Sequence, residues 1–131
     1  MNPAKDTVQR YFRSMGGEDD TPITEFFAPN IRWHLPPAHP YGGPFEGIPA
    51  VLEMMALGGD LFLFETIVFN HHALIAEGDN VVAHFGLSAK TPDGRDYRNE
   101  YLFRFRCEDG KIAEVWEFMD SYLQYQMGMF D

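Results

Sequence analysis

The chain has 131 residues, a length that fits a single domain (residues 1–131) built around one hydrophobic core. Twenty acidic residues against ten Lys and Arg give a formal charge of -10, which argues against the basic surface that nucleic-acid binding normally requires. Aromatic residues make up 15% of the chain, so we expect a large core or a core that lines a cavity.

The N-terminal third is predicted to be mainly helical. Asn2 can cap a first helix, which carries an apolar stripe on one face and stops at Gly16 and Gly17. A short second helix is expected after Thr21, closed by Pro29. After a short strand over residues 31–35 comes the stretch PPAHPYGGPFEG at residues 36–47, which reads as an irregular loop of the kind that often covers a site. A third helix is predicted over residues 49–57.

The rest of the chain is strand-like. β-Branched and aromatic residues fill segments 62–76, 81–90, 97–107 and 111–120, and turn sequences separate them. Helices followed by an antiparallel meander predict an α+β fold, with a curved sheet that carries its helices on one face.

Period-two alternation assigns side chains to the two faces of the last strands. In segment 97–107 one face carries Tyr97, Asn99, Tyr101, Phe103 and Phe105. In the last strand the same parity groups Trp116, Phe118 and Asp120 on one face, with Glu117 and Met119 on the other.

Asp120 has two interpretations. Beside Trp116 and Phe118 a carboxylate loses hydration, which raises its pKa toward the range that suits proton transfer near neutral pH. Alternatively, Asp120 or Ser121 caps a short C-terminal helix, because Ser121 and Gln124 match a capping box.

Two further polar residues are candidates for the site. Asn99, among aromatic residues, binds either a ligand carbonyl or a neighbouring backbone group. His84 lies on the more polar face of its strand, which is either solvated or lines a cavity, and histidine is the natural proton carrier near neutral pH.

Residues near the proline-rich loop complete the candidate site. Trp33 is expected in the core, and His34 and Tyr41 are expected either at a cavity rim or at the surface. His71 and His72 face opposite sides of a strand, and the spacing of His, Cys and carboxylates predicts no metal site. The only cysteine, Cys107, has no basic cluster beside it, which favours a buried structural thiol over a nucleophile.

No apolar window is long enough to span a membrane, and no apolar run follows a basic start at the N-terminus. We therefore expect a cytoplasmic protein without a membrane partner. No phosphate-binding loop or dinucleotide fingerprint is present in the sequence, so no cofactor is predicted.

Several ordered motifs resemble those of a known family. They are the Trp33 strand, the Gly47-Ile48-Pro49 helix start, the turn AEGDNVV at residues 76–82, DGRDYRNEY at 93–101, and the ending from DGKI at 109–112 to EFMD at 117–120. Together they resemble the SnoaL-like, ketosteroid-isomerase-like branch of the nuclear transport factor 2-like superfamily.

The resemblance implies a cystatin-like cone, in which three N-terminal helices wrap a curved antiparallel sheet around an apolar pocket. It also implies a homodimer joined through the convex sheet face. Relatives place an acid or base aspartate at the end of the last strand, where this chain has Asp120. Tyr11 corresponds to a tyrosine on the first helix of ketosteroid isomerases, whereas their base aspartate has no counterpart in residues 34–37.

The sequence therefore predicts a cofactor-independent acid–base enzyme of isomerase or cyclase type, acting on a small apolar carbonyl compound. Asp120 and His84 would be catalytic. Substrate contacts would come from Tyr11, Trp33, His34, Tyr41, Asn99, Tyr101, Trp116 and Phe118. The alternative is a non-catalytic domain that binds a small hydrophobic metabolite, and a structural subunit of an aromatic-ring dioxygenase is less favoured.

Overall fold

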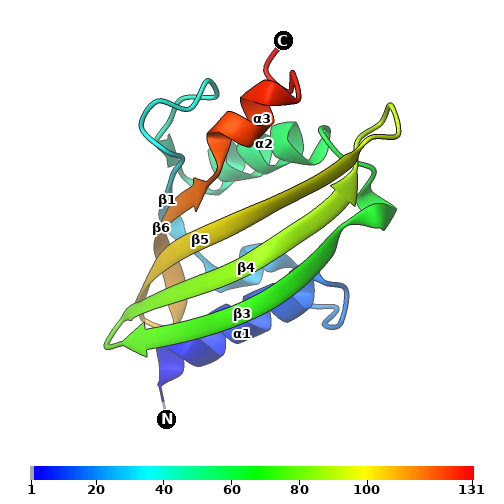
Figure 1. Ribbon diagram of the computed structural model, residues 1–131. Coiled ribbons are helices and arrows are strands. Elements are labelled where there is room, and N and C mark those ends of the chain that lie inside the picture. The colour runs from blue at the N-terminus through cyan, green and yellow to red at the C-terminus, as the bar shows by residue number, and fades with distance from the viewer. Residues whose placement is uncertain (1) are drawn as a thin grey trace.

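The structure, a computed structural model, describes residues 2–131 and confirms the α+β fold (Figure 1). Six strands form one open, curved sheet in the order β2-β1-β6-β5-β4-β3. The strands are β1 Phe27–His34, β2 Phe45–Glu46, β3 Val68–Glu77, β4 Asn80–Lys90, β5 Asp96–Glu108 and β6 Lys111–Met119. The helices are α1 Pro3–Met15, α2 Ile48–Gly59 and α3 Ser121–Gln126, with single 3₁₀ turns at Ile23–Phe26 and Phe64–Thr66.

The sheet is antiparallel from β3 to β6, as predicted, but β1 pairs with β6 in parallel. No hairpin joins these two strands, since they come from opposite ends of the chain, and so their direction is not set by a turn. This pairing places Trp33 beside Val115 and brings the first strand next to the last.

Helix α1 covers the inner face of the sheet. It begins as predicted, with Pro3 in its first turn and the Asn2 side chain accepting a hydrogen bond from the Lys5 backbone N–H at 3.0 Å. Tyr11 and Phe12 lie on its buried face, and both rings pack against Phe105, with centroids 5.8 Å away in each case.

None of the helices formed by residues 2–131 has the length and apolar character that a membrane span requires.

Several predicted elements and boundaries were wrong. The expected second N-terminal helix is only the 3₁₀ turn Ile23–Phe26, the expected loop at 36–47 contains strand β2, and the strand predicted from residue 62 begins at Val68. Pro29 lies inside β1 and does not end the preceding helical turn, which stops at Phe26. The pairing of β1 with β6 shifts register between Phe27 and Arg32, and such an irregularity accommodates a proline that cannot donate to the ladder. Helix α2 runs from Ile48 through Gly59, two residues beyond the predicted end, and Asp60 is its C-cap.

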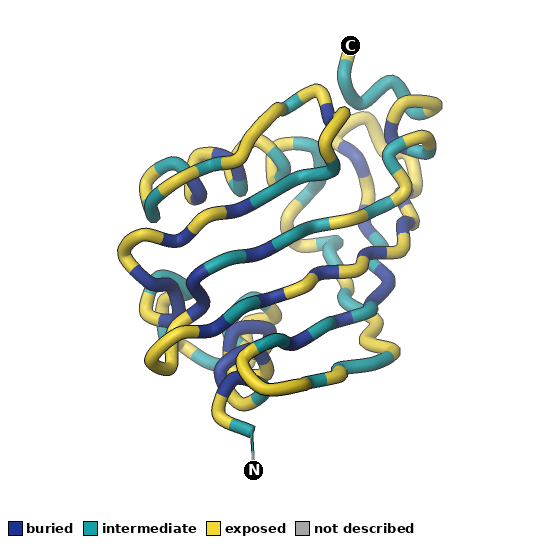
Figure 2. The backbone as a smooth tube through the Cα atoms, turned by 90° about the vertical axis from the view of Figure 1, so that its left-hand side faces the viewer, coloured by how far each residue is buried: buried dark blue, intermediate teal, exposed yellow. Residues whose placement is uncertain are grey.

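The alternation predicted for segment 97–107 is confirmed. Buried and exposed residues alternate along β5 (Figure 2), and along the first half of β4 buried residues alternate with half-buried ones. The inward-facing residues Tyr97, Asn99, Tyr101, Phe103 and Phe105 are all buried. Cys107 continues this row as a buried thiol, and burial raises its pKa to about 11, as expected of a structural cysteine.

Candidate functional site

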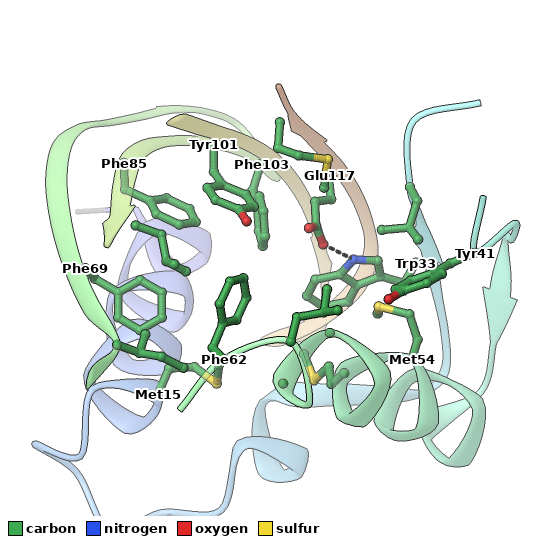
Figure 3. A pocket seen from close by; sticks show the side chains of 18 of the residues that line it. Met15, Trp33, Tyr41, Met54, Phe62, Phe69, Phe85, Tyr101, Phe103 and Glu117 are labelled. Atoms are coloured by element: carbon green, nitrogen blue, oxygen red, sulfur yellow. Dashed lines mark hydrogen bonds between the residues drawn. The ribbon is translucent and has the colours of Figure 1, made fainter. Parts of the chain in front are cut away.

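A cavity of about 200 Å³ lies between the inner face of the sheet and helices α1 and α2 (Figure 3). Its wall is mostly apolar and aromatic, as is typical of sites for small ligands. Residues that supply this apolar wall include Met15, Met54, Phe62, Phe69, Phe85 and Phe103.

Glu117 is the one carboxylate among the described residues that line this cavity. It lies on β6 opposite Phe103 of β5, and paired residues of an antiparallel sheet point to the same face. The indole N–H of Trp33 donates a hydrogen bond to its Oε1 at 2.9 Å, drawn as the dashed line in Figure 3. That contact orients the carboxyl group, and its second oxygen accepts no hydrogen bond from the described residues and faces the cavity.

Burial in this apolar wall raises the pKa of Glu117 to about 7, although the Trp33 N–H opposes part of the rise. An acid with a pKa near 7 exists in both protonation states at neutral pH. It can therefore accept a proton and return it, which an ordinary surface glutamate does poorly.

Tyr101 places a hydroxyl in the same cavity, and Figure 3 shows its ring projecting inward from the sheet, with the Phe103 ring drawn between it and Glu117. Its partner is the buried Tyr97 hydroxyl, whose oxygen lies 2.7 Å away. The Tyr97 oxygen also accepts hydrogen bonds from the side-chain amides of Asn99 at 2.7 Å and Gln124 at 3.1 Å.

These contacts determine the direction of the Tyr97–Tyr101 hydrogen bond. A phenol oxygen has two lone pairs, and the two amide donors occupy both lone pairs of Tyr97. Tyr97 must therefore donate its own proton to Tyr101. The hydroxyl proton of Tyr101 has no other acceptor among the hydrogen bonds of residues 2–131, so it is available to a ligand in the cavity.

The proline-rich loop contributes His39 and Tyr41 to the cavity wall. The Tyr41 backbone N–H donates to His39 Nδ1 at 3.2 Å, so the proton of the neutral imidazole lies on Nε2, which donates to Gln124 Oε1 at 3.3 Å. Burial lowers the pKa of His39, which keeps it neutral. Phe130 packs on both rings, with centroids 4.9 Å from His39 and 5.8 Å from Tyr41.

The expected burial of Asp120 is wrong. Its side chain is exposed and accepts a hydrogen bond from the Leu123 backbone N–H at 3.1 Å, as the N-cap of α3. The structure thus agrees with the second interpretation of this residue, a helix cap. The parity of β6 was assigned correctly, but its inner face is the one that carries Glu117 and Met119.

His84, which the sequence suggested as a catalytic residue together with Asp120, does not line the apolar cavity. It lies on the outer face of the sheet, with 41% of its side chain exposed, and its Nε2 is 3.1 Å from Oε1 of Glu100. Its strand alternates as predicted, and the more polar face is the solvated one.

Three predicted substrate contacts also lie outside the cavity. His34 stacks on Trp116 with the ring centroids 5.3 Å apart, and the guanidinium of Arg104 lies 4.3 Å above the Trp116 ring. Phe118 is 47% exposed on the same outer face. The expectation that these three line the pocket is wrong. The predicted homodimer through this face stays a prediction.

Four predicted contacts do line the cavity: Tyr11, Trp33, Tyr41 and Tyr101. Asn99 is buried behind them, and its amide is fully used. Its Oδ1 accepts from the backbone N–H groups of Glu100 and Asp120 at 2.8 and 3.1 Å, and its Nδ2 donates to Tyr97 and to the Asp120 carbonyl. Asn99 thus supports the site from behind and has no group left for a ligand.

The main residue that sequence reasoning missed is Glu117. The strand KIAEVWEFM offers Trp116 and Phe118 as the obvious inward face, which leaves Glu117 for solvent. The alternative parity groups Val115, Glu117 and Met119, and Val115 is completely buried. That grouping was a hint of Glu117 in the sequence, but period-two alternation alone does not choose between the two faces.

Comparisons with known proteins agree with this architecture. The SnoaL-like domain family matches residues 8–115. A solved NTF2-like protein of unknown function from Burkholderia pseudomallei is 17% identical, with a TM-score of 0.83 over 96% of this chain and 97% of that chain. A protein described as a SnoaL-like polyketide cyclase, from Jannaschia sp. CCS1, is 22% identical, with a TM-score of 0.80 over 98% of this chain and 92% of that chain.

A protein of unknown function with a cystatin-like fold, from Xanthomonas campestris, is 25% identical, with a TM-score of 0.77 over 92% of both chains. A comparison with curated proteins found no match. The structural likenesses establish an NTF2-like, cystatin-like fold, and the family match extends over most of the sequence. The chain belongs to the SnoaL-like domain family.

Proposed function

We propose that the protein is a cofactor-independent acid–base enzyme of isomerase or cyclase type, acting on a small apolar carbonyl compound. The observation that carries the proposal is the Glu117 carboxyl group in an apolar cavity, with a pKa of about 7 and a hydrogen bond from Trp33. The available hydroxyl proton of Tyr101 supports it, because it supplies a donor for a substrate oxygen.

In the proposed first step, the ionised Glu117 takes a proton from the carbon next to the substrate carbonyl. The electrons of the broken C–H bond form a C=C bond, and the carbonyl π electrons move to oxygen, giving an enolate. Tyr101 donates a hydrogen bond to that oxygen as its negative charge develops, the charge stabilisation expected of an oxyanion site.

In the second step the enolate collapses in one of two ways. Where the substrate carries a C=C bond next to the abstracted carbon, the intermediate is a dienolate, and its protonation at the far carbon by the Glu117 acid moves the double bond, which is an isomerisation. Attack of the enolate carbon on a second carbonyl of the same molecule forms a C–C bond, which is an aldol cyclisation, and the Glu117 acid protonates the resulting alkoxide. Both routes are redox-neutral and return Glu117 to its ionised form.

The apolar wall favours a substrate with little polar surface, because a second charge would lose its hydration there. The cavity volume of about 200 Å³ limits the substrate to a small molecule. Membership of the SnoaL-like family and the likeness to a protein described as a polyketide cyclase support this class of reaction.

The test is exchange of α-protons in small cyclic ketones, followed by NMR in D₂O. This probe requires only the first step and no knowledge of the natural substrate. We expect wild-type protein to accelerate exchange for at least one ketone of the panel, and Glu117→Gln to abolish the acceleration. Asp120→Asn is the matched control, since it also removes a nearby carboxylate but preserves the helix cap.

If Glu117→Gln exchanges as fast as wild type, or Asp120→Asn is the inactive variant, the proposal fails. The apolar wall is equally suited to the alternative function, a binding domain for a hydrophobic metabolite. In that case ketones bind, as seen by NMR shift changes of residues lining the cavity, but no variant alters their exchange.

A further inference from the structure

Three potential metal ligands meet on the outer face of the sheet, opposite the cavity. They come from three neighbouring strands: His72 from β3, His84 from β4 and Glu100 from β5. Nε2 of each histidine lies 3.1 Å from Oε1 of Glu100. The candidate ligand atoms of the three residues all lie within 4.8 Å of one another.

A bulge in β3 brings His72 to this face. His71 pairs with Phe85 and Ala73 pairs with His84, so β3 advances by two residues while β4 advances by one. His72 is the extra residue, and its ring lies beside that of His84, with centroids 4.7 Å apart. Such bulges re-aim side chains and often occur beside functional sites.

Gly86 leaves the space that Glu100 occupies. It pairs directly with Glu100 across β4 and β5. A Cβ atom at this position would lie 2.7 Å from Oε2 of Glu100 and 3.6 Å from Nε2 of His72. Any other residue would force the end of the Glu100 side chain to shift from this position.

We propose that His72, His84 and Glu100 bind a first-row divalent transition-metal ion of the Zn²⁺ class. Two imidazoles and one carboxylate are ligands that zinc takes, usually with water in the remaining position. In a tetrahedral complex with bonds of about 2.0–2.1 Å, neighbouring ligand atoms lie about 3.3 Å apart. The two separations of 3.1 Å are close to that value, and all candidate ligand atoms lie within 4.8 Å of one another, so the two imidazoles need to approach each other by at most about 1.5 Å.

The surroundings are open enough for the remaining coordination position. His72, Gly86 and Glu100 line a hollow of about 450 Å³ on the outer face, and all three ligand side chains are at least one-third exposed. Water can therefore complete the coordination. This hollow and the cavity that contains Glu117 and Tyr101 have only Leu87 in common among their lining residues. The proposed metal site is therefore independent of the proposed enzyme activity.

The test is calorimetric titration of ZnCl₂ into tag-free, chelator-treated protein, with Co²⁺ absorption as a second readout of coordination. We expect one ion per wild-type chain. His84→Ala, His72→Ala and Glu100→Gln should each weaken binding by at least about tenfold, the lower end of the losses seen for residues that merely orient a ligand. Zinc should raise the thermal midpoint of wild type and leave that of His84→Ala unchanged.

Two further variants keep the test decisive. Gly86→Val retains all three ligands but fills the space beside Glu100, so it should also weaken binding. His34→Gln is the matched control, because it removes another outer-face histidine, one paired with Glu114 at 2.6 Å, and should bind zinc as wild type does. Absence of zinc binding by folded wild-type protein, or equal affinity in wild type and the His84→Ala and Glu100→Gln variants, would overturn the proposal.

Discussion

Trp33 and Glu117 form a hydrogen bond of 2.9 Å between two parallel neighbouring strands, β1 and β6, that come from opposite ends of the chain. The bond holds the carboxyl group in the cavity wall, where burial raises its pKa to about 7. The hydrogen bond from Trp33 lowers this pKa, whereas burial raises it. Removing the hydrogen bond should therefore change the pKa in a direction that can be measured.

Trp33→Phe should raise the pKa of Glu117. The indole N–H stabilises the ionised form, and a hydrogen bond to a charged group contributes about 1.5–3 kcal/mol, which corresponds to a rise of about one pKa unit or more. The measurement is ¹³C NMR titration of the Glu117 carboxyl carbon in both proteins. An unchanged or lower pKa in Trp33→Phe would show that the indole does not stabilise the carboxylate.

The free energy of unfolding should carry a pH dependence that belongs to Glu117. Its folded pKa of about 7 is above the ordinary value of 4.5, so between these pH values the folded state holds a proton that the unfolded state has lost. Stability from this group is thus fully present below about pH 4.5 and falls by up to about 3 kcal/mol as the pH rises through 7.

Urea unfolding of wild type and Glu117→Gln at pH 5 and pH 8 tests this dependence. The difference between the two proteins isolates Glu117 from groups that titrate in both, such as the buried His39. The wild type should lose stability relative to Glu117→Gln as the pH rises. Parallel stability curves for the two proteins would contradict the raised pKa.

Tyr97→Phe should destabilise the protein more than Tyr101→Phe. Loss of the Tyr97 oxygen leaves the amide donors of Asn99 and Gln124 without this acceptor, and each buried unpaired group costs about 1–3 kcal/mol. Tyr101→Phe leaves only the Tyr97 proton unpaired, yet it removes the cavity donor. Urea denaturation and the ketone exchange assay together separate the two effects, and equal stabilities would show that the amides of Asn99 and Gln124 do not depend on the Tyr97 oxygen.

Asp120→Ala should destabilise the protein by about 0.5–2 kcal/mol, the usual cost of losing an N-cap, while Asp120→Asn should cost much less. The measurement is the free energy of unfolding of both variants at neutral pH. A variant Asp120→Ala as stable as wild type would show that the cap contributes little to holding α3 in place.

The main helices, the four long strands and the alternation along β4, β5 and β6 followed from the sequence alone. Asn2 and Pro3 predicted the start of α1, and the row from Tyr97 to Phe105 predicted the buried face of β5. These are local properties, because a cap satisfies groups within one helical turn and side chains alternate strictly along an extended chain.

Which face of β6 lies inside was decided only by tertiary structure. A period of two separates Glu117 from Trp116 but does not say which of them faces the core, and side-chain hydrophobicity favoured the wrong one. The register with β5 sets Glu117 opposite Phe103, and β1 brings Trp33 from the other end of the chain to bind it. The meeting of His72, His84 and Glu100 also depends on register and on a bulge, which no single strand encodes. The sequence by itself thus determined the strands and their alternation, whereas pairing between distant strands decided where the carboxylates and histidines came together.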